Sequence, residues 1–283
     1  MSEARVGVIG GSGLYQMEGL EDVREVRPAT PFGDPSDAIV LGSVEGVPTA
    51  FLPRHGRGHR LSPSEVPARA NFYALKSLGV ERVVSVSAVG SLKEEVRPLD
   101  LVVPDQLIDR TRQRPSTFFE DGVVAHVALA DPFCAELSGR VAQAAEEEGA
   151  SVHRGGTYVV IEGPAFSTRA ESHLYRSWGA SVIGMTALPE AKLAREAELC
   201  YTVLACATDY DVWRESEEDV SVEMVVAALL RNVATSQKIL RRLIPRLTEE
   251  RDCPCATALR NAVITAPDAI PAEARERLGL FLE

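Results

Sequence analysis

Two aspartates at the end of a strongly apolar stretch provide the clearest candidate chemistry in the chain. Residues 201–207 are mostly small or apolar, and Asp209 and Asp211 follow them. If the extended backbone persists past Thr208, these side chains point to the same side. Two such carboxyl groups can accept hydrogen bonds from a neutral ligand, or one can hold a proton and donate it. The alternative is an acidic loop that caps the helix expected from residue 221.

A second group of residues is suited to binding an oxyanion. Residues 54–60 read RHGRGHR and directly follow an expected strand. The guanidinium of Arg54 matches phosphate oxygens, and the imidazole of His55 can donate a hydrogen bond. Glycines around Ser12, in the turn 10–14, can turn backbone N–H groups inward as an anion-binding nest. The alternatives are a solvated basic loop for residues 54–60 and an ordinary turn for residues 10–14.

Other polar or aromatic residues stand just after expected strands. Ser87 and Ala88 end the strand 82–88, which a glycine turn at 89–91 follows. Thr186 comes after the short strand 182–184. Phe166 is either a platform for a flat heterocycle or an ordinary core residue. If these strand ends converge on one crevice, the site has an anion-binding pole and a separate carboxylate pole.

The elements that must position these residues alternate between strands and helices. We expect strands over 6–9, 39–44, 49–53, 82–88, 101–103, 155–161, 182–184 and 201–208, and helices over 67–78, 133–148, 169–178, 189–197 and 221–243. Residues 110–131 form a long irregular stretch, interpreted as a lid or a subunit contact. This pattern predicts an α/β fold, a single domain with a central mixed sheet flanked by helices.

Length, composition and charge fit one soluble globular domain. The chain has 283 residues, 45% of them apolar, and a formal net charge of −11. This charge argues against broad binding to nucleic acids or acidic membranes, which need a basic footprint. No apolar run approaches the length of a membrane span and no signal peptide is evident, so we expect a cytoplasmic protein.

The five cysteines show no spacing typical of a zinc site. Cys134, Cys200 and Cys206 lie in apolar settings and are expected in the core. Cys253 and Cys255 flank one proline, and such a pair can form a strained redox pair or bridge to other thiols. A structural disulfide is therefore one hypothesis, although cytoplasmic chains are usually reduced.

Taken together, the motifs resemble the purine nucleoside phosphorylase superfamily and, within it, the methylthioadenosine phosphorylases. The matching segments span roughly residues 5–245 in order: 8–14 (VIGGSGL), 30–33 (TPFG), 54–57 (RHGR), 71–76 (NFYALK), 87–91 (SAVGS), 108–111 (IDRT), 162–167 (EGPAFS), 184–186 (GMT) and 207–211 (ATDYD). The resemblance implies a catalytic domain over 1–247. It leaves 248–283 as an extension that packs on this domain or on a neighbouring subunit.

The resemblance also implies an activity and a role for each residue. The activity is phosphorolysis of S-methyl-5'-thioadenosine to adenine and 5-methylthioribose 1-phosphate, in purine and methionine salvage. The implied phosphate ligands are Ser12, Arg54, His55, Ser87, Ala88 and Thr186. Asp209 is the implied general acid or donor at purine N7, and with Asp211 it accepts from the 6-amino group. The residues implied to pack on base and sugar or to shape specificity are Phe166, Met185, Ser167 and Val222, and His126 is expected to reach a neighbour's site.

Several alternatives stay open at this stage. The chain could be a phosphorylase for adenosine, inosine, guanosine or methylthioinosine, a hydrolytic nucleosidase, or a nucleoside-binding regulatory protein. The superfamily uses asparagine at the first acid for 6-oxopurines, so the two acids here favour a 6-aminopurine. The resemblance implies a homotrimer or homohexamer, and no metal or organic cofactor, with inorganic phosphate as a co-substrate.

Overall fold

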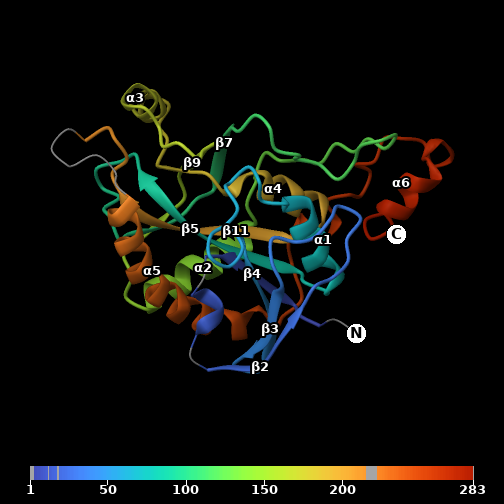
Figure 1. Cartoon of the computed structure of the whole chain (residues 1–283), viewed down its shortest axis with the longest axis horizontal. Helices are drawn as coiled ribbons and strands as arrows, with labels where there is room; N and C mark the ends of the chain where they lie inside the picture. Colours follow the sequence, from blue (N-terminus) through green and yellow to red (C-terminus); the bar gives the residue numbers. More distant parts are fainter. Residues whose placement is uncertain (1–2, 12, 18, 215–221, 283) are drawn as a thin grey trace.

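One mixed sheet of eleven strands runs through the centre of the molecule, and helices cover both of its faces (Figure 1). The structure is a computed structural model that describes residues 3–11, 13–17, 19–214 and 222–282. Its path of paired strands is β2-β3-β4-β1-β5-β10-β9-β7, and β11, β6 and β8 branch from β5 in that order. The expected α/β class is confirmed. No helix in the described ranges is both long enough and apolar enough to cross a membrane.

The strands lie close to their expected positions, with three additions. They are β1 (Val6–Gly10), β2 (Leu20–Val26), β3 (Ile39–Val44), β4 (Val47–Pro53), β5 (Arg82–Ser91), β6 (Leu101–Val103), β7 (Gln106–Arg110), β8 (Val152–Arg154), β9 (Thr157–Ile161), β10 (Val182–Gly184) and β11 (Cys200–Asp209). The sequence analysis missed β2, β7 and β8. β2 is mostly exposed, and β7 and β8 are at most half-buried, so the three lack the apolar signal of a core strand.

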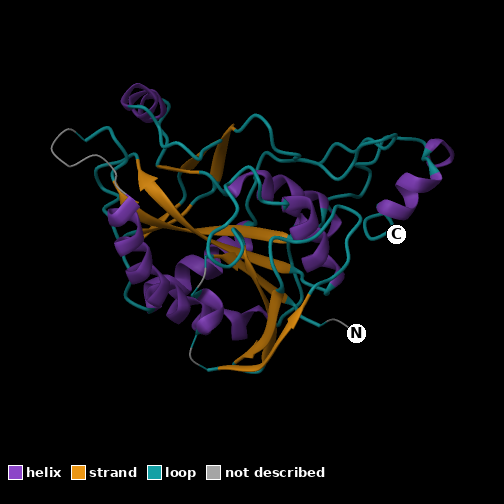
Figure 2. Ribbon diagram, in the orientation of Figure 1, coloured by secondary structure: helices purple, strands orange, loops and turns teal. Residues whose placement is uncertain are grey.

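The helices also follow the expected pattern. They are α1 (Ala68–Ser77), α2 (Ala135–Glu147), α3 (Arg169–Ser177), α4 (Ala187–Glu196), α5 (Val222–Leu243) and the unexpected α6 (Ala272–Arg277), with 3₁₀ turns at Leu14–Gln16, Ile244–Leu247, Pro254–Thr257 and Pro267–Ala269. A capping box of Thr168 and Glu171 fixes the start of α3. Residues 111–131 are irregular, as expected, and run beside the C-terminal tail (Figure 2).

The hairpin of β3 and β4 turns at Glu45 and Gly46. Both residues have positive φ, 48° and 80°, which is the requirement of a two-residue type I′ turn.

The expected glycine turn at 89–91 is wrong. Gly90 and Ser91 continue β5 and pair antiparallel with β10. One neighbour therefore changes along the strand: its first part pairs with β1 and its end with β10, while β11 pairs with it as far as Gly90. This change of pairing partner keeps the end of β5 in the middle of the sheet.

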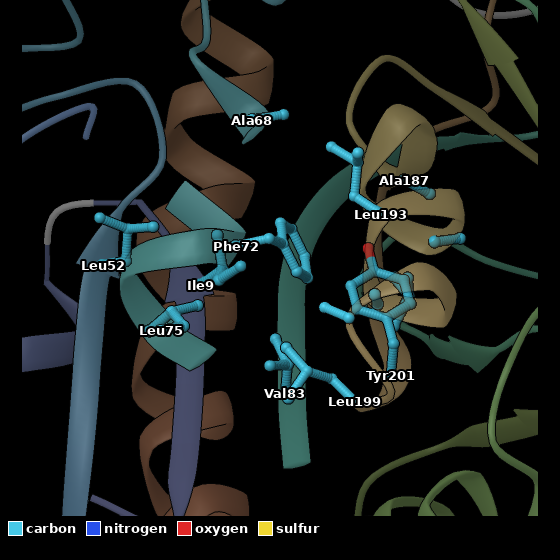
Figure 3. Close-up of a cluster of buried hydrophobic side chains, with 14 of the residues drawn as sticks. Ile9, Leu52, Ala68, Phe72, Leu75, Val83, Ala187, Leu193, Leu199 and Tyr201 are labelled. Carbon is cyan, nitrogen blue, oxygen red and sulfur yellow. The ribbon is translucent and has the colours of Figure 1, made fainter. Parts of the chain in front are cut away.

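Apolar side chains fill the space between the sheet and the helices. On the side of α1 and α4, Ile9, Leu52 and Phe72 pack with Leu75 and Tyr201 (Figure 3). Helices α2 and α5 cover the other face with a second buried cluster. Two packed faces require strands that are apolar on both sides, and every residue of β11 is buried.

Candidate active site

A pocket of about 250 Å³ opens at the carboxyl ends of four parallel strands. These strands are β4, β1, β5 and β11, which pair parallel to one another in that order. Ligands of open α/β sheets bind at this edge. Ten of the residues singled out from the sequence line the pocket: Arg54, His55, Ser87, Ala88, Phe166, Ser167, Met185, Thr186, Asp209 and Asp211.

Two hydroxyl groups meet at one end of the pocket. The Oγ atom of Ser87, on β5, lies 2.8 Å from Oγ1 of Thr186, which precedes α4. Hydroxyl groups rotate to donate or accept, so this pair can donate to an anion. Gly11, next to Ser12, borders the pocket, and Ser12 itself lies outside the described residues.

A buried network fixes Arg54 beneath these hydroxyls. Its Nε donates to Oε1 of Glu190 at 2.5 Å, and Nη2 donates to Oε2 of Glu190 at 3.3 Å. Nη2 also donates to Oγ of Ser85 at 2.5 Å, and Nη1 to the carbonyl of Val86 at 3.1 Å. These four bonds use four of the five guanidinium N–H groups, so within the described residues one Nη1 N–H is left for a ligand.

The carboxylate of Glu190 is the centre of this network. Oε2 also accepts from Ser85 Oγ at 3.1 Å and from the Tyr201 hydroxyl at 2.8 Å. Arg54 and Glu190 are 3% exposed each, so neither charge is stable there without the other. Burial opposes the charge of Arg54, but the Glu190 carboxylate raises the pKa of Arg54 above its ordinary value.

His55 borders the same end of the pocket in its neutral form. Burial and then the charge of Arg54 lower the pKa of His55 to about 4. Its Nδ1 lies 2.9 Å from the carbonyl oxygen of Leu61, so Nδ1 carries the proton and donates. The remaining nitrogen, Nε2, is then an acceptor, suited to a P–OH group rather than to an unprotonated phosphate oxygen. His59, from the same basic segment 54–60, also lines the pocket and stacks on His55 with ring centroids 4.3 Å apart.

The two aspartates line the same pocket, though not because the strand stays extended. The ladder between β11 and β5 is irregular between Ala207 and Asp209, and Asp211 has a φ of 51°. The extended backbone therefore ends at Asp209, and a bulge and a left-handed residue turn both carboxyl groups into the pocket. The backbone does not stay extended as far as Asp211, yet the two side chains converge.

Hydrogen bonds hold the pair in place. Oδ1 of Asp209 accepts from the backbone N–H of Asp211 at 2.8 Å, and Oδ2 accepts from Oγ1 of Thr208 at 2.6 Å. The hydroxyl of Ser167 lies 3.2 Å from both oxygens of Asp211. Burial raises the pKa of Asp211 above its ordinary value.

A glycine makes room for this arrangement. A Cβ atom at Gly90 would lie 3.0 Å from Oδ1 of Asp209 and 3.3 Å from Cβ of Asp211. The close approach of β5 to the aspartates therefore requires glycine at this position.

Apolar side chains form the wall between the two poles. Phe166 is 48% exposed although it lines the pocket, so its ring is accessible to a ligand. Met185 packs against Gly163, where a Cβ would lie 2.4 Å from its sulfur. Ile161 and Ile183 complete the wall and were not singled out from the sequence.

Besides Ser12, two more of the predicted site residues are not placed in this pocket. Val222 begins α5, but its side chain lies outside the described part of the structure. His126 is exposed in the irregular stretch, where its backbone N–H donates to the carbonyl of Ala262 in the tail.

The sequence analysis missed two residues that support the site. Glu190 lies in an ordinary helix pattern and gave no local signal. Arg114 lies in the irregular stretch 110–131, and its buried guanidinium donates to the carbonyls of Ile161, Glu162, Met185 and Leu188. It thereby ties the irregular stretch to the two segments that carry Phe166 and Met185.

Comparison with known proteins agrees with this architecture. The model of the phosphorylase superfamily matches residues 5–245. S-methyl-5'-thioadenosine phosphorylase of Geobacter sulfurreducens is 62% identical over 99% of this chain and 98% of its own, and that of Chloroflexus aurantiacus is 58% identical over 99% and 97%. A methylthioadenosine phosphorylase from an antarctic soil metagenomic library superposes with a TM-score of 0.96 at 50% identity over all of both chains. The Schistosoma mansoni methylthioadenosine phosphorylase, solved with adenine, gives 0.85 at 37% identity over 94% and 99%.

These matches cover nearly the whole chain at high identity. The chain therefore belongs to the phosphorylase superfamily and, within it, to the S-methyl-5'-thioadenosine phosphorylases.

Proposed function

We propose that the protein catalyses phosphorolysis of S-methyl-5'-thioadenosine, giving adenine and 5-methylthioribose 1-phosphate. The observation that carries the proposal is the presence of both groups in one pocket, which hydroxyls, Arg54 and His55 line together with two aspartates. Full-length relatives at 50–62% identity that are methylthioadenosine phosphorylases support the same activity.

At the anion pole, phosphate receives hydrogen bonds from Ser87, Thr186 and the remaining N–H of Arg54. The neutral His55 accepts from a P–OH group, which orients an unprotonated oxygen toward the sugar. We assign Ser12 and Ala88 to the same pole, as the family resemblance implies. Phosphate then forms the new bond to C1' of the ribosyl group while the bond from C1' to the purine breaks.

At the carboxylate pole, Asp209 meets the negative charge that develops on the departing purine. As the glycosidic bond lengthens, a proton or hydrogen bond from Asp209 to N7 stabilises the leaving group. Asp209 and Asp211 also accept from the 6-amino group, whereas a 6-oxo group would place an oxygen against two carboxyl groups. This contrast favours adenine over hypoxanthine or guanine and argues against the other purine nucleosides as main substrates.

The wall between the poles holds the base and the methylthioribose. Phe166 and Met185 pack on base and sugar, and Ser167 orients Asp211. We assign Val222 to the methylthio group, on the family resemblance alone.

The test is adenine release from methylthioadenosine with and without phosphate. We expect release that depends on phosphate, and a loss of about 10²- to 10⁴-fold in Asp209→Ala. Asp131→Ala is a matched control, because that aspartate is exposed outside the pocket. Phosphate-independent release would instead indicate a nucleosidase, and full activity in Asp209→Ala would remove this residue from the mechanism.

We further propose that the enzyme is a homotrimer or homohexamer in which His126 reaches a neighbour's site. Val124 and Ile264, which lie beside His126 on the contact between the irregular stretch and the tail, are 45% and 63% exposed. Such a cluster is suited to a second copy of the chain. Sedimentation of the wild type and of Val124→Asp tests this: a monomeric wild type contradicts it, and dissociation of the variant supports it.

We place the reaction in the cytoplasm. The five cysteines are free thiols, the state that a reducing compartment maintains. Cell fractionation with an antibody to the chain tests this assignment.

A further inference from the structure

Four of the five cysteines converge on one point at the start of β11, outside the lining of the pocket. Cys134, Cys200, Cys253 and Cys255 present sulfur atoms that all lie within 4.8 Å of one another. Three of these residues are buried and Cys253 is half-buried. We propose that this cluster is a structural zinc site that fastens the C-terminal tail to the catalytic domain.

The geometry of the sulfur atoms matches that of a closed tetrahedral site. Zinc bound by four thiolates has Zn–S bonds of about 2.3 Å, so its sulfur atoms lie about 3.8 Å apart. The four thiol sulfurs all lie within 4.8 Å of one another, and none is bonded to another. The separation of 3.3 Å between the sulfurs of Cys200 and Cys253 is far longer than the S–S bond of a disulfide, about 2.05 Å.

The four ligands also come from suitable elements. Cys200 begins the central strand β11, and Cys134 immediately precedes α2. The backbone N–H of Cys134 donates to the carbonyl of Tyr201 at 2.8 Å, which holds the two segments together. The positive end of the α2 dipole favours a thiolate at Cys134. Cys134 and Cys200 are thus fixed by the core, and Cys253 and Cys255 of the tail supply the other two ligands.

Zinc is the metal that this ligand set selects. Soft thiolates in a tetrahedral arrangement favour zinc or an iron–sulfur centre over magnesium or calcium. Four protein ligands leave no open position for water or substrate, which is typical of a structural rather than a catalytic site.

The site joins the tail to the strand and the helix that carry Cys200 and Cys134, beside the tail's other bonds to the domain. Near the cluster, Arg82 donates to the carbonyls of Leu247 and Glu249, and Arg251 donates to that of Glu198. Beyond the cluster, the tail reaches the irregular stretch at His126 and Ala262. Loss of the metal should therefore loosen the tail before it affects the pocket.

The experiment is metal analysis of the full-length protein, expressed with zinc and purified under reducing conditions without chelator. We expect one equivalent of zinc per chain by mass spectrometry, and the intense charge-transfer bands of a tetrahedral thiolate site when cobalt replaces it. Cys253→Ser with Cys255→Ser should lose the zinc and lower Tm by several degrees. Cys206→Ala, which removes the buried cysteine outside the cluster, should keep the full zinc content.

Two results would overturn the proposal. One is wild-type protein that stays free of zinc and gives no cobalt thiolate bands. The other is alkylation trapping in fresh lysate that finds these cysteines joined as disulfides. Both rest on wild-type protein, so they hold even if the double variant fails to fold, and neither depends on the proposed phosphorolysis.

Discussion

At the scale of single residues, the main observation is that the guanidinium of Arg54 is already hydrogen-bonded within the protein before any ligand binds. Most of its N–H groups are bonded to Glu190, Ser85 and Val86. Its role at the phosphate is therefore that of a fixed charge with one directed N–H, and Glu190 is the residue that positions it. A rigid guanidinium loses little rotamer freedom when phosphate binds.

Glu190→Gln should raise KM for phosphate and leave KM for methylthioadenosine nearly unchanged. The substitution removes the charge that fixes Arg54, and we expect it to cost about 3 kcal/mol of stability because one charge of a buried pair stays behind. Initial rates at varied phosphate, together with urea denaturation, measure both effects.

Glu196→Gln is the matched control for this prediction. Glu196 is also buried on α4, but it accepts from Thr117 and the N–H of Phe118, away from Arg54. The Glu196→Gln variant should lose stability without a change in KM for phosphate. An equal rise of KM in both variants would contradict a specific role of Glu190.

The lowered pKa of His55 predicts that acid destabilises the ligand-free protein. In the unfolded chain His55 takes up a proton near its ordinary pKa of 6.5, whereas in the folded chain it does so only near 4. The unfolded state binds more protons within this window, so stability falls as pH drops from 6.5 to about 4. We expect His55 to contribute roughly 1–3 kcal/mol to this fall.

Urea denaturation between pH 4 and 7 in phosphate-free buffer checks the effect. His55→Gln should flatten the curve in this window, and the exposed His126→Gln should not. An unchanged slope in His55→Gln would assign the acid sensitivity to other groups.

At the scale of elements, loops and strand ends build the site on a rigid sheet. β5 crosses the sheet, β11 ends in a bulge, and Arg114 fastens the irregular stretch to the segments around Phe166 and Met185. These segments form the apolar wall of the pocket, so the irregular stretch affects the pocket through them.

Arg114→Ala should weaken nucleoside binding and destabilise the fold. Its removal leaves four backbone carbonyls without their donor, and we expect a loss of at least about 2 kcal/mol together with a higher KM for methylthioadenosine. Arg112→Ala, with an exposed side chain on the same stretch, is the control. An Arg114→Ala protein with wild-type KM and stability would show that the stretch is held by other contacts.

At the scale of the whole molecule, the C-terminal tail closes one side of the domain. Phe281 is buried against Phe118, Phe119 and Tyr73. The tail and the irregular stretch lie side by side, away from α5 (Figure 1). We propose that residues 1–247 are the catalytic domain and that 248–283 stabilise it from outside.

Phe281→Ala should lower the free energy of unfolding by about 3–4 kcal/mol, because it opens a cavity among aromatic side chains. Val23→Ala, which trims a residue that is 55% exposed, should change it by less than about 0.5 kcal/mol. Chemical denaturation of the two variants measures the difference. Similar values for both would mean that the tail contributes little to the fold.

The sequence alone determined what depends on local pattern. Runs of apolar residues predicted most strands, the helical spacing predicted five helices, and short motifs, together with the family resemblance that they carry, identified ten residues of the pocket. These features could be predicted because each arises from neighbouring residues and from the period of one element.

Only the tertiary structure decided the contacts between distant residues. Glu190 meets Arg54 across 136 positions of the chain, and the four clustered cysteines come from three separate segments. The bulge that turns Asp209 and Asp211 into the pocket depends on how β11 pairs with β5. No local periodicity records such pairings, because they arise only when the sheet and its helices pack together.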